Sequence, residues 1–211
     1  FSNPHIIDCS TTITGNVVIG PGTRLVFREG TELIVTGGLS VEGTAEEPVL
    51  FEGDGSGGFA GLSIRGNGGD ASLSYLTIAG GGYTEDGLVG SLTIDSGPVK
   101  LNHVTILDAY DCGVSLTEDG RIHADSNDIT VKRSDGFGLC ANAQAVQEID
   151  ESLFTLDENQ DQGISVSGTA MSGFHSWTAT SLPYVIGETI TLSSGDFTVG
   201  PGATLAFERY Q

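Results

Sequence analysis

The chain has 211 residues, with 32 glycines, only 6 prolines and apolar residues throughout, so we expect a folded domain with a sizeable core and not a disordered chain. Its 28 acidic and 8 basic residues give a formal net charge of −20, which excludes a nucleic-acid binder and disfavours binding to an anionic membrane surface. No apolar run reaches the roughly 18 residues that a membrane-spanning helix needs, so we expect no direct membrane insertion.

The chain begins at Phe1, with no apolar signal segment before it, so we expect a processed protein or a part of a longer one. Residues 4–29 read as short apolar strands around a Gly20-Pro-Gly turn that is followed by x-Leu-x-Phe.

Four-residue strands recur after this opening, each with a small residue, an apolar residue, a small polar residue and a second apolar residue. The apolar second positions step by 30, 22, 25 and 25 residues. In stacked parallel strands about 4.8 Å apart, such residues form inward columns. We predict a first column of Leu62, Leu92, Val114, Leu139 and Ile164, and a second of Ile64, Ile94, Leu116, Ala141 and Val166.

A second series runs beside the first and begins with the matching stretches Leu73–Ile78 and Leu101–Ile106. It continues more loosely, with steps of 28, 23, 25 and 23 residues. We expect its final apolar residues to stack on another face: Ile78, Ile106, Ile129, Phe154 and Trp177.

These repeats contain only strands and turns, which predicts an all-β fold: a right-handed parallel β-helix, a solenoid of about seven coils of 22–30 residues. A β-propeller blade needs roughly 40 residues, and leucine-rich repeats would show a Leu and Asn ladder. Seven coils at about 4.8 Å each give a rod about 35 Å long.

Residues 183–209 repeat the opening, with Gly200-Pro-Gly, the same x-Leu-x-Phe and a Pro about 17 residues upstream. We predict a β-helix module over 1–182, followed over 183–211 by the start of a second copy of the N-terminal motif or by a C-terminal coil or cap. An unpaired last coil would expose a strand edge prone to association, so more chain, another subunit or a cap should cover it.

The stretch Gly20–Gly30, followed by Leu33–Phe51, resembles the opening of bacterial right-handed β-helix surface and secreted proteins, which share the pectate-lyase superfamily architecture. Phe59–Ile64 and Ser72–Ile78 continue the resemblance, although Phe59 stands where relatives commonly carry Trp. The resemblance is specific over 13–110 and 183–209. It implies the fold and an extracellular or cell-surface location, and it implies no reaction.

Enzymes of this architecture usually cleave polysaccharides, yet the chain has no Arg-x-Lys, Asn-Thr-Asp or Gly-His-Gly, and its charge would repel a polyuronate. We therefore expect a non-catalytic structural or adhesive module, binding a glycan or a neighbouring cell-surface protein, with further copies of the module in the parent chain. The alternative is a polysaccharide lyase or glycoside hydrolase, or the carbohydrate-binding part of one.

Two outward columns are candidate sites. The first is a hydroxyl ladder, interrupted by Cys140, that could bind sugar: Ser63, Thr93, Ser115 and Ser165. It could equally be a row of ordinary solvent-facing strand residues.

The second candidate column is acidic, with Asp111, Asp135 and Asp161 each two or three residues before a strand-opening Gly, and with Glu85 or Asp86 as further members. Asp favours such turns because its carboxylate accepts backbone N–H groups. Stacked acids also repel unless they are offset, screened or bridged by a hard cation such as Ca²⁺, so calcium is the possible cofactor.

The remaining cysteines and histidines suggest no framework or metal motif. Cys9, Cys112 and Cys140 are odd in number and irregular in spacing, which gives no disulfide framework. Because Cys112 falls in a turn and Cys140 in a strand, we do not expect them to pair, and we expect small buried or half-buried residues. His103 and His123 are expected on one face, one coil apart, as separate surface residues or as a metal pair.

Overall fold

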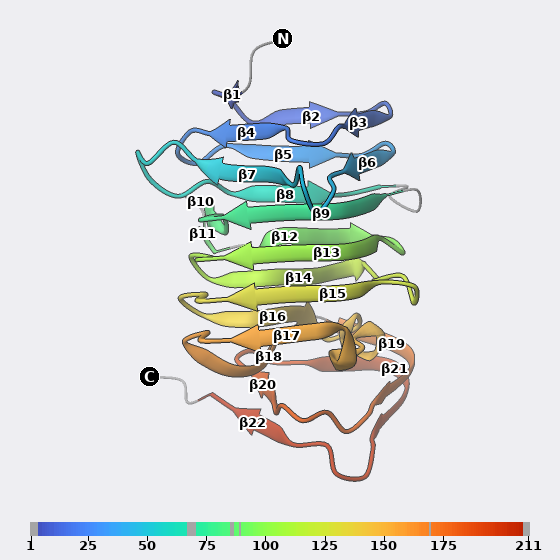
Figure 1. Ribbon diagram of the computed structural model, residues 1–211. Coiled ribbons are helices and arrows are strands. Elements are labelled where there is room, and N and C mark those ends of the chain that lie inside the picture. Colours follow the sequence, from blue (N-terminus) through green and yellow to red (C-terminus); the bar gives the residue numbers. More distant parts are fainter. Residues whose placement is uncertain (1–3, 67–70, 85–86, 89, 169, 209–211) are drawn as a thin grey trace.

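The computed structural model describes residues 4–66, 71–84, 87–88, 90–168 and 170–208. As predicted, the chain winds about seven turns as a right-handed parallel β-solenoid, with the N-terminus at one end of the stack and the C-terminus at the other (Figure 1). Two long parallel sheets form opposite faces, and their strands run in opposite directions across the view.

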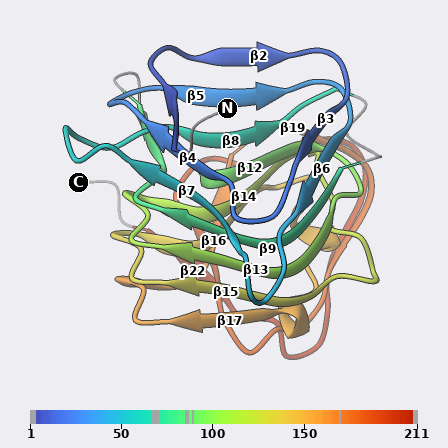
Figure 2. The same cartoon turned by 45° about the horizontal axis from the view of Figure 1, so that its top comes forward.

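Each coil of the N-terminal part crosses three walls (Figure 2). We call the wall with most strands wall 1 and number the other two in the order in which the chain then reaches them. Wall 1 is a nine-stranded sheet: β2 (Thr11–Ile13), β5 (Glu32–Val35), β8 (Gly61–Ile64), β12 (Gly90–Ser96), β14 (Cys112–Asp119), β16 (Phe137–Asn142), β18 (Asp161–Ser167), β20 (Tyr184–Ile186) and β22 (Leu205–Phe207). Wall 2 starts with β3 (Val17–Ile19) and β6 (Leu39–Glu42) and continues in the first halves of β9 (Ser72–Ala79) and β13 (Lys100–Leu107). Wall 3 consists of β1 (His5–Ile7), β4 (Arg24–Phe27), β7 (Val49–Gly53), the second halves of β9 and β13, β15 (Asn127–Lys132) and β17 (Phe154–Asp157).

The corner between walls 2 and 3 changes form along the stack. In an early coil the segment 43–48 separates β6 from β7. In later coils a single residue with positive φ bends one continuous strand around the corner: Tyr75 (48°), His103 (52°) and Asp128 (52°). This left-handed conformation costs a non-glycine residue roughly 1–2 kcal/mol, so the packing on both sides of the corner must hold it in place.

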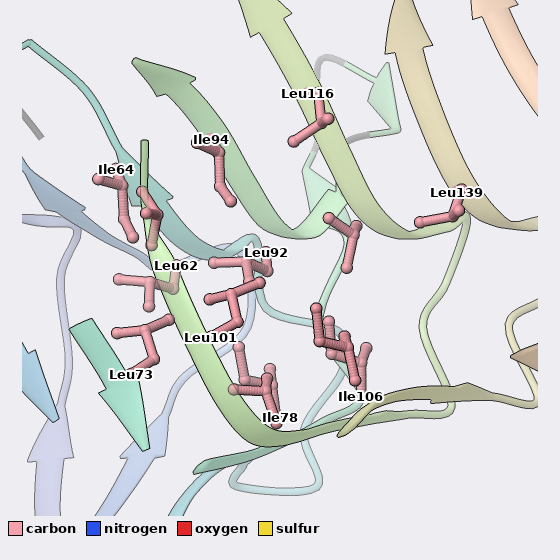
Figure 3. Close-up of a cluster of buried hydrophobic side chains, with 14 of the residues drawn as sticks. Leu62, Ile64, Leu73, Ile78, Leu92, Ile94, Leu101, Ile106, Leu116 and Leu139 are labelled. Atoms are coloured by element: carbon pink, nitrogen blue, oxygen red, sulfur yellow. The ribbon is translucent and has the colours of Figure 1, made fainter. Parts of the chain in front are cut away.

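The interior is filled by the predicted columns. Leu62, Leu92, Val114, Leu139 and Ile164 are direct neighbours on successive wall 1 strands, as are Ile64, Ile94, Leu116, Ala141 and Val166. All ten side chains are buried, and Figure 3 shows several of them directed into the interior toward Leu73, Leu101, Ile78 and Ile106 from the opposite side. Each buried Leu or Ile contributes roughly 1.5–3 kcal/mol, so the stack of columns is the main source of stability.

The second predicted series is right at its start and wrong further on. Ile78 pairs with Ile106, but Ile106 lies beside Val131, whereas Ile129 pairs with Val104 and Phe154. The error is a slip of two residues, which leaves every side chain on the same face of the strand and is therefore invisible to the hydrophobic pattern.

Trp177 also lies outside the predicted column. It ends β19 (Ala170–Trp177), which pairs with β21 (Thr191–Val199) in a separate two-stranded parallel sheet. The coil before it leaves the strand pattern through two 3-10 turns, η2 (Val146–Glu148) and η3 (Glu151–Leu153). A short antiparallel pair, β10 (Tyr83–Thr84) and β11 (Gly87–Leu88), lies between β9 and β12 in the chain.

The two similar terminal segments occupy different walls. The turn at Gly20-Pro-Gly22 leads into β4 on wall 3, whereas the turn at Gly200-Pro-Gly202 leads into β22 on wall 1. Both turns use a glycine with positive φ, 67° at Gly22 and 84° at Gly202. Because β20 and β22 continue the sheet of β18 in parallel, residues 184–207 form further coils of the same solenoid.

Candidate functional site

The predicted hydroxyl ladder exists on wall 1 in the expected register. Ser63, Thr93, Ser115, Cys140 and Ser165 are successive neighbours from β8 to β18. Its first two hydroxyls are engaged within the protein, since Ser63 donates to a Glu32 carboxylate oxygen and Thr93 donates to the carbonyl of Gly90. Ser63 is also only 4% exposed. The half of this ladder nearest the N-terminus therefore offers little to a ligand.

Ion pairs tie the same part of wall 1 together across three coils. The Arg65 guanidinium lies 3.0 Å from a Glu32 oxygen and 3.1 Å from an Asp95 oxygen. Thr117 of the following coil donates a short hydrogen bond to Asp95. These contacts run along the solenoid axis and satisfy the charged groups internally.

The two cysteines of wall 1 form a disulfide, so the expectation of unpaired residues is wrong. Cys112 and Cys140 are bonded, with Cα atoms 6.2 Å apart. The strand register places Cys140 beside Ser115, three residues after Cys112, which opens β14. Cys9 is exposed and unpaired.

The predicted acidic column is only partly a cluster. Asp111 is half-buried, and its carboxyl pKa is raised by this burial and by the negative charge of Asp161. Asp135 and Asp161 are exposed, and Glu85 and Asp86 lie outside the described residues. Within the described ranges, no three His, Cys, Asp or Glu side chains are arranged to hold a metal ion. Calcium on this column stays a prediction.

The two histidines that could have formed a metal pair have separate partners. His103 stacks on Tyr75, with ring centroids 4.4 Å apart, and its Nδ1 lies 2.6 Å from the Asp128 carboxylate. The His123 Nδ1 instead accepts a hydrogen bond from the backbone N–H of Asp125.

Wall 3 carries a hydroxyl ladder that the sequence patterns did not single out. Thr77, Thr105, Thr130 and Thr155 are direct neighbours on β9, β13, β15 and β17, with no other residue type between them. Each threonine stands between two inward apolar residues, such as Val104 and Ile106. No other described residue forms a hydrogen bond with any of these four hydroxyls. The ladder, which we call the Thr ladder, is therefore regular, outward-facing and unengaged.

Polar and aromatic groups border the Thr ladder on its wall 2 side. Tyr75, His103 and Asp128 form the corner column two residues before Thr77, Thr105 and Thr130. Next to them the Asn127 amide donates to the Asn102 side-chain oxygen at 3.0 Å.

Charged pairs border the other side of the Thr ladder. Lys132 contacts Asp157 at 2.9 Å, and Arg133 makes two hydrogen bonds to Asp108. The bonds to Asp108, together with the negative charges of Glu158 and Asp157, raise the pKa of the Arg133 guanidinium.

The Thr ladder could have been found from the sequence by a correct alignment of the second series. Once Ile106 is placed beside Val131, the preceding Thr105 and Thr130 coincide, and Thr77 and Thr155 follow. The two-residue slip concealed the regularity.

No family model, curated protein or solved structure matches the chain. No helix among the described residues is long and apolar enough to cross a membrane. The fold and the arrangement of its outward ladders therefore carry the functional argument.

Proposed function

We propose that this protein is a non-catalytic, extracellular adhesive module of a surface or secreted protein, and that it binds a neutral polysaccharide along wall 3. The observation that carries the proposal is the Thr ladder, with four unengaged hydroxyls in register on successive coils. A row that repeats about every 4.8 Å along the axis suits a linear polymer lying parallel to the solenoid. Each hydroxyl can both donate and accept a hydrogen bond, as sugar hydroxyls do.

The neighbouring groups support a sugar ligand. The Tyr75 and His103 rings offer an apolar surface with polar edges, and the amides of Asn102 and Asn127 add donors and acceptors. A net charge of −20 favours a neutral polymer over a polyuronate.

The Cys112–Cys140 disulfide supports an extracellular location, because disulfides persist in oxidising compartments and are rare in the cytosol. Together with the resemblance of the opening motifs, it favours a bacterial protein of the surface-exposed or secreted β-helix kind, with pectate-lyase-like architecture.

The test is a binding panel of soluble neutral glucans, mannans, galactans and xylans, with polyuronates for contrast, measured by calorimetry. The double variant Thr105→Val/Thr130→Val keeps the side-chain shape and removes two hydroxyls. Two lost hydrogen bonds at about 0.5–1.5 kcal/mol each should weaken binding roughly tenfold. The matched control is Thr93→Val/Ser115→Ala on wall 1, which should bind like the parent protein.

Two results would overturn the proposal: no binding to any polymer on the panel, or an equal loss of affinity in the wall 1 control. The second result would move the site to the Ser63, Thr93, Ser115 and Ser165 ladder.

The enzymatic alternative and the calcium prediction are tested by two further assays. Incubating the same polymers with the protein, with and without Ca²⁺, should yield no new reducing ends or unsaturated products. Thermal melting with and without EDTA tests the Asp111, Asp135 and Asp161 column directly, and an unchanged midpoint excludes calcium there.

A further inference from the structure

Wall 2 is interrupted where the chain forms the 3-10 turn η2. One coil earlier, an isolated parallel bridge still joins Ile122 to Val99. In the coil of η2 no strand takes this position among the described residues, and β19 of the following coil pairs with β21 in a separate sheet. η2 itself packs against β19. The hydrogen-bonded stack of wall 2 is therefore broken at this place.

A cavity of about 190 Å³ opens at the break, and three successive coils line it. The lining comes from the end of β14 and the turn after it, from the segment 144–148 around η2, and from β19. Its charged and titratable side chains are Glu118, Asp119, Arg121, Glu148 and His175. Pockets for drug-sized ligands measure roughly 300–1,000 Å³, so this cavity suits a molecule of about the size of a monosaccharide.

His175 brings an unpaired polar atom to the cavity. The side chain is only 6% exposed, and its Nε2 lies 2.9 Å from the backbone carbonyl oxygen of Ser172. Because a carbonyl oxygen only accepts, Nε2 carries the hydrogen, and in the neutral ring Nδ1 is then an acceptor. This Nδ1 is buried and has no hydrogen-bond partner. Buried polar atoms are rarely left unpaired, so a donor from a ligand in the cavity is the partner that this nitrogen lacks.

The charged groups around the cavity attract a cation. Glu118, Asp119 and Glu148 are exposed, and no described residue forms an ion pair or hydrogen bond with their carboxylates. The Arg121 guanidinium is engaged elsewhere, since it donates to the backbone carbonyl of Gly97 at 3.2 Å. Three carboxylates and one guanidinium give the lining a formal charge of −2. A cleft lined mainly by one sign of charge concentrates ions of the opposite sign.

The backbone holds both acidic sides of the cavity in place. In the turn after β14, the Gly120 N–H donates to the Thr117 carbonyl at 2.8 Å. In the segment before η2, the Ala145 N–H donates to the Asn142 side-chain oxygen at 2.8 Å, and the Glu148 N–H then donates to the Ala145 carbonyl. The carboxylates are thus carried on fixed turns, which lowers the cost of ordering them around a ligand.

We propose that this cavity binds a small molecule that carries a protonated primary amine. The ammonium group donates to Nδ1 of His175, and Glu118, Asp119 and Glu148 balance its charge. An alkylammonium has three donors and no acceptor, which matches a site made mainly of acceptors. A metal ion fits less well, because no three His, Cys, Asp or Glu side chains in the described chain are arranged to hold one. This inference is independent of the polysaccharide site, since the cavity shares no residue with the Thr ladder.

The first experiment follows the ring nitrogens of His175 by ¹⁵N NMR at constant pH. The probes are 1,4-diaminobutane and glucosamine, and butane-1,4-diol and glucose are their neutral analogues. At least one amine should shift the Nδ1 resonance of His175 in a saturable way, whereas neither neutral analogue should shift it. The amine that binds more tightly shows whether the site prefers a free diamine or an amino sugar.

A pair of charge variants tests the acidic side chains. Glu118→Gln/Glu148→Gln should weaken amine binding at least about tenfold, because two charge-assisted hydrogen bonds are lost. Glu46→Gln/Glu47→Gln is the matched control, since it makes the same change in net charge at two exposed positions of the segment 43–48. The control should bind the amine like the parent protein.

The proposal fails if neither amine shifts the His175 resonance, or if a neutral analogue binds as tightly as its amine. It also fails if the control loses as much affinity as the Glu118 and Glu148 variant, which would show attraction by the net charge alone. A shift caused by Ca²⁺ or Zn²⁺ and by neither amine would assign the cavity to a metal instead. Circular dichroism and melting of each variant separate these outcomes from misfolding.

Discussion

Walls 1 and 3 have the same inward chemistry and opposite outward chemistry. Inside, both present buried aliphatic columns at every coil. Outside, wall 1 uses polar residues for contacts between coils, namely Ser63 with Glu32 and Arg65 with Glu32 and Asp95. The Cys112–Cys140 disulfide also joins two of its coils. Wall 3 leaves its Thr ladder unengaged; its ion pairs lie at the border of the ladder and, in the earlier coils, between Arg24 of β4 and Glu52 of β7.

The difference shows how a solenoid can separate stability from recognition. The parallel stacking fixes both sheets equally, so the outward residues of one wall are not needed to hold the fold. Wall 1 should therefore respond to mutation mainly through stability, and wall 3 mainly through binding.

The largest expected effect is on wall 1. Replacing the disulfide in Cys112→Ser/Cys140→Ser should lower the free energy of unfolding by about 3 kcal/mol, because the bond restricts the unfolded chain. Urea unfolding of the oxidised parent and the double variant measures the loss, and Cys9→Ser serves as the control. Equal midpoints for parent and double variant would contradict the assignment of the disulfide as a stabilising element.

The ion pairs of wall 1 should have a smaller effect. Arg65→Met keeps much of the apolar stem and removes both contacts with Glu32 and Asp95, which should cost about 1 kcal/mol. The loss should shrink at high salt because the pairs are partly exposed. A loss that stays constant from low to high salt would point to packing and not to charge. Polysaccharide affinity should not change.

On wall 3 a substitution should affect binding more than stability. Thr105→Val should change stability by no more than about 0.5 kcal/mol, as for an ordinary surface position. The same substitution should weaken polysaccharide binding a few-fold by removing one hydrogen bond. Paired unfolding and calorimetry measurements test both halves, and a variant that loses stability while binding normally would break the separation of the two walls.

The smallest effect concerns Asp111 in the corner before β14. Burial and the charge of Asp161 raise its carboxyl pKa, so the ionised form opposes folding at neutral pH. Stability from the protonated form is present at low pH and is lost as pH rises through the raised pKa. Asp111→Asn should therefore be slightly more stable than the parent at pH 7, with the gap closing in acid. A pH series of melting curves measures the difference in stability between the variant and the parent. A difference that grows in acid would show that the ionised Asp111 carboxylate favours folding.

The sequence predicts the fold because inward residues of successive coils obey a repeat that needs no three-dimensional information. The columns of Leu62 and Ile64 are correct in every member. The Thr ladder was missed because a two-residue slip at Ile129 preserves the inward pattern. The disulfide was missed because the repeat aligns Cys140 with Ser115 and not with Cys112, so the sequence pattern gives no sign that the two cysteines meet.

The corner between walls 2 and 3 suggests a use of its own. One coil passes it with the six-residue segment 43–48 and the later coils with a single residue, yet both sheets continue on either side. The length of the loop at this position can therefore change without disturbing the pairing of the strands. Exposed connections of this kind accept grafted peptides. A peptide inserted there would be displayed beside the threonines, where selection could retune what the face recognises.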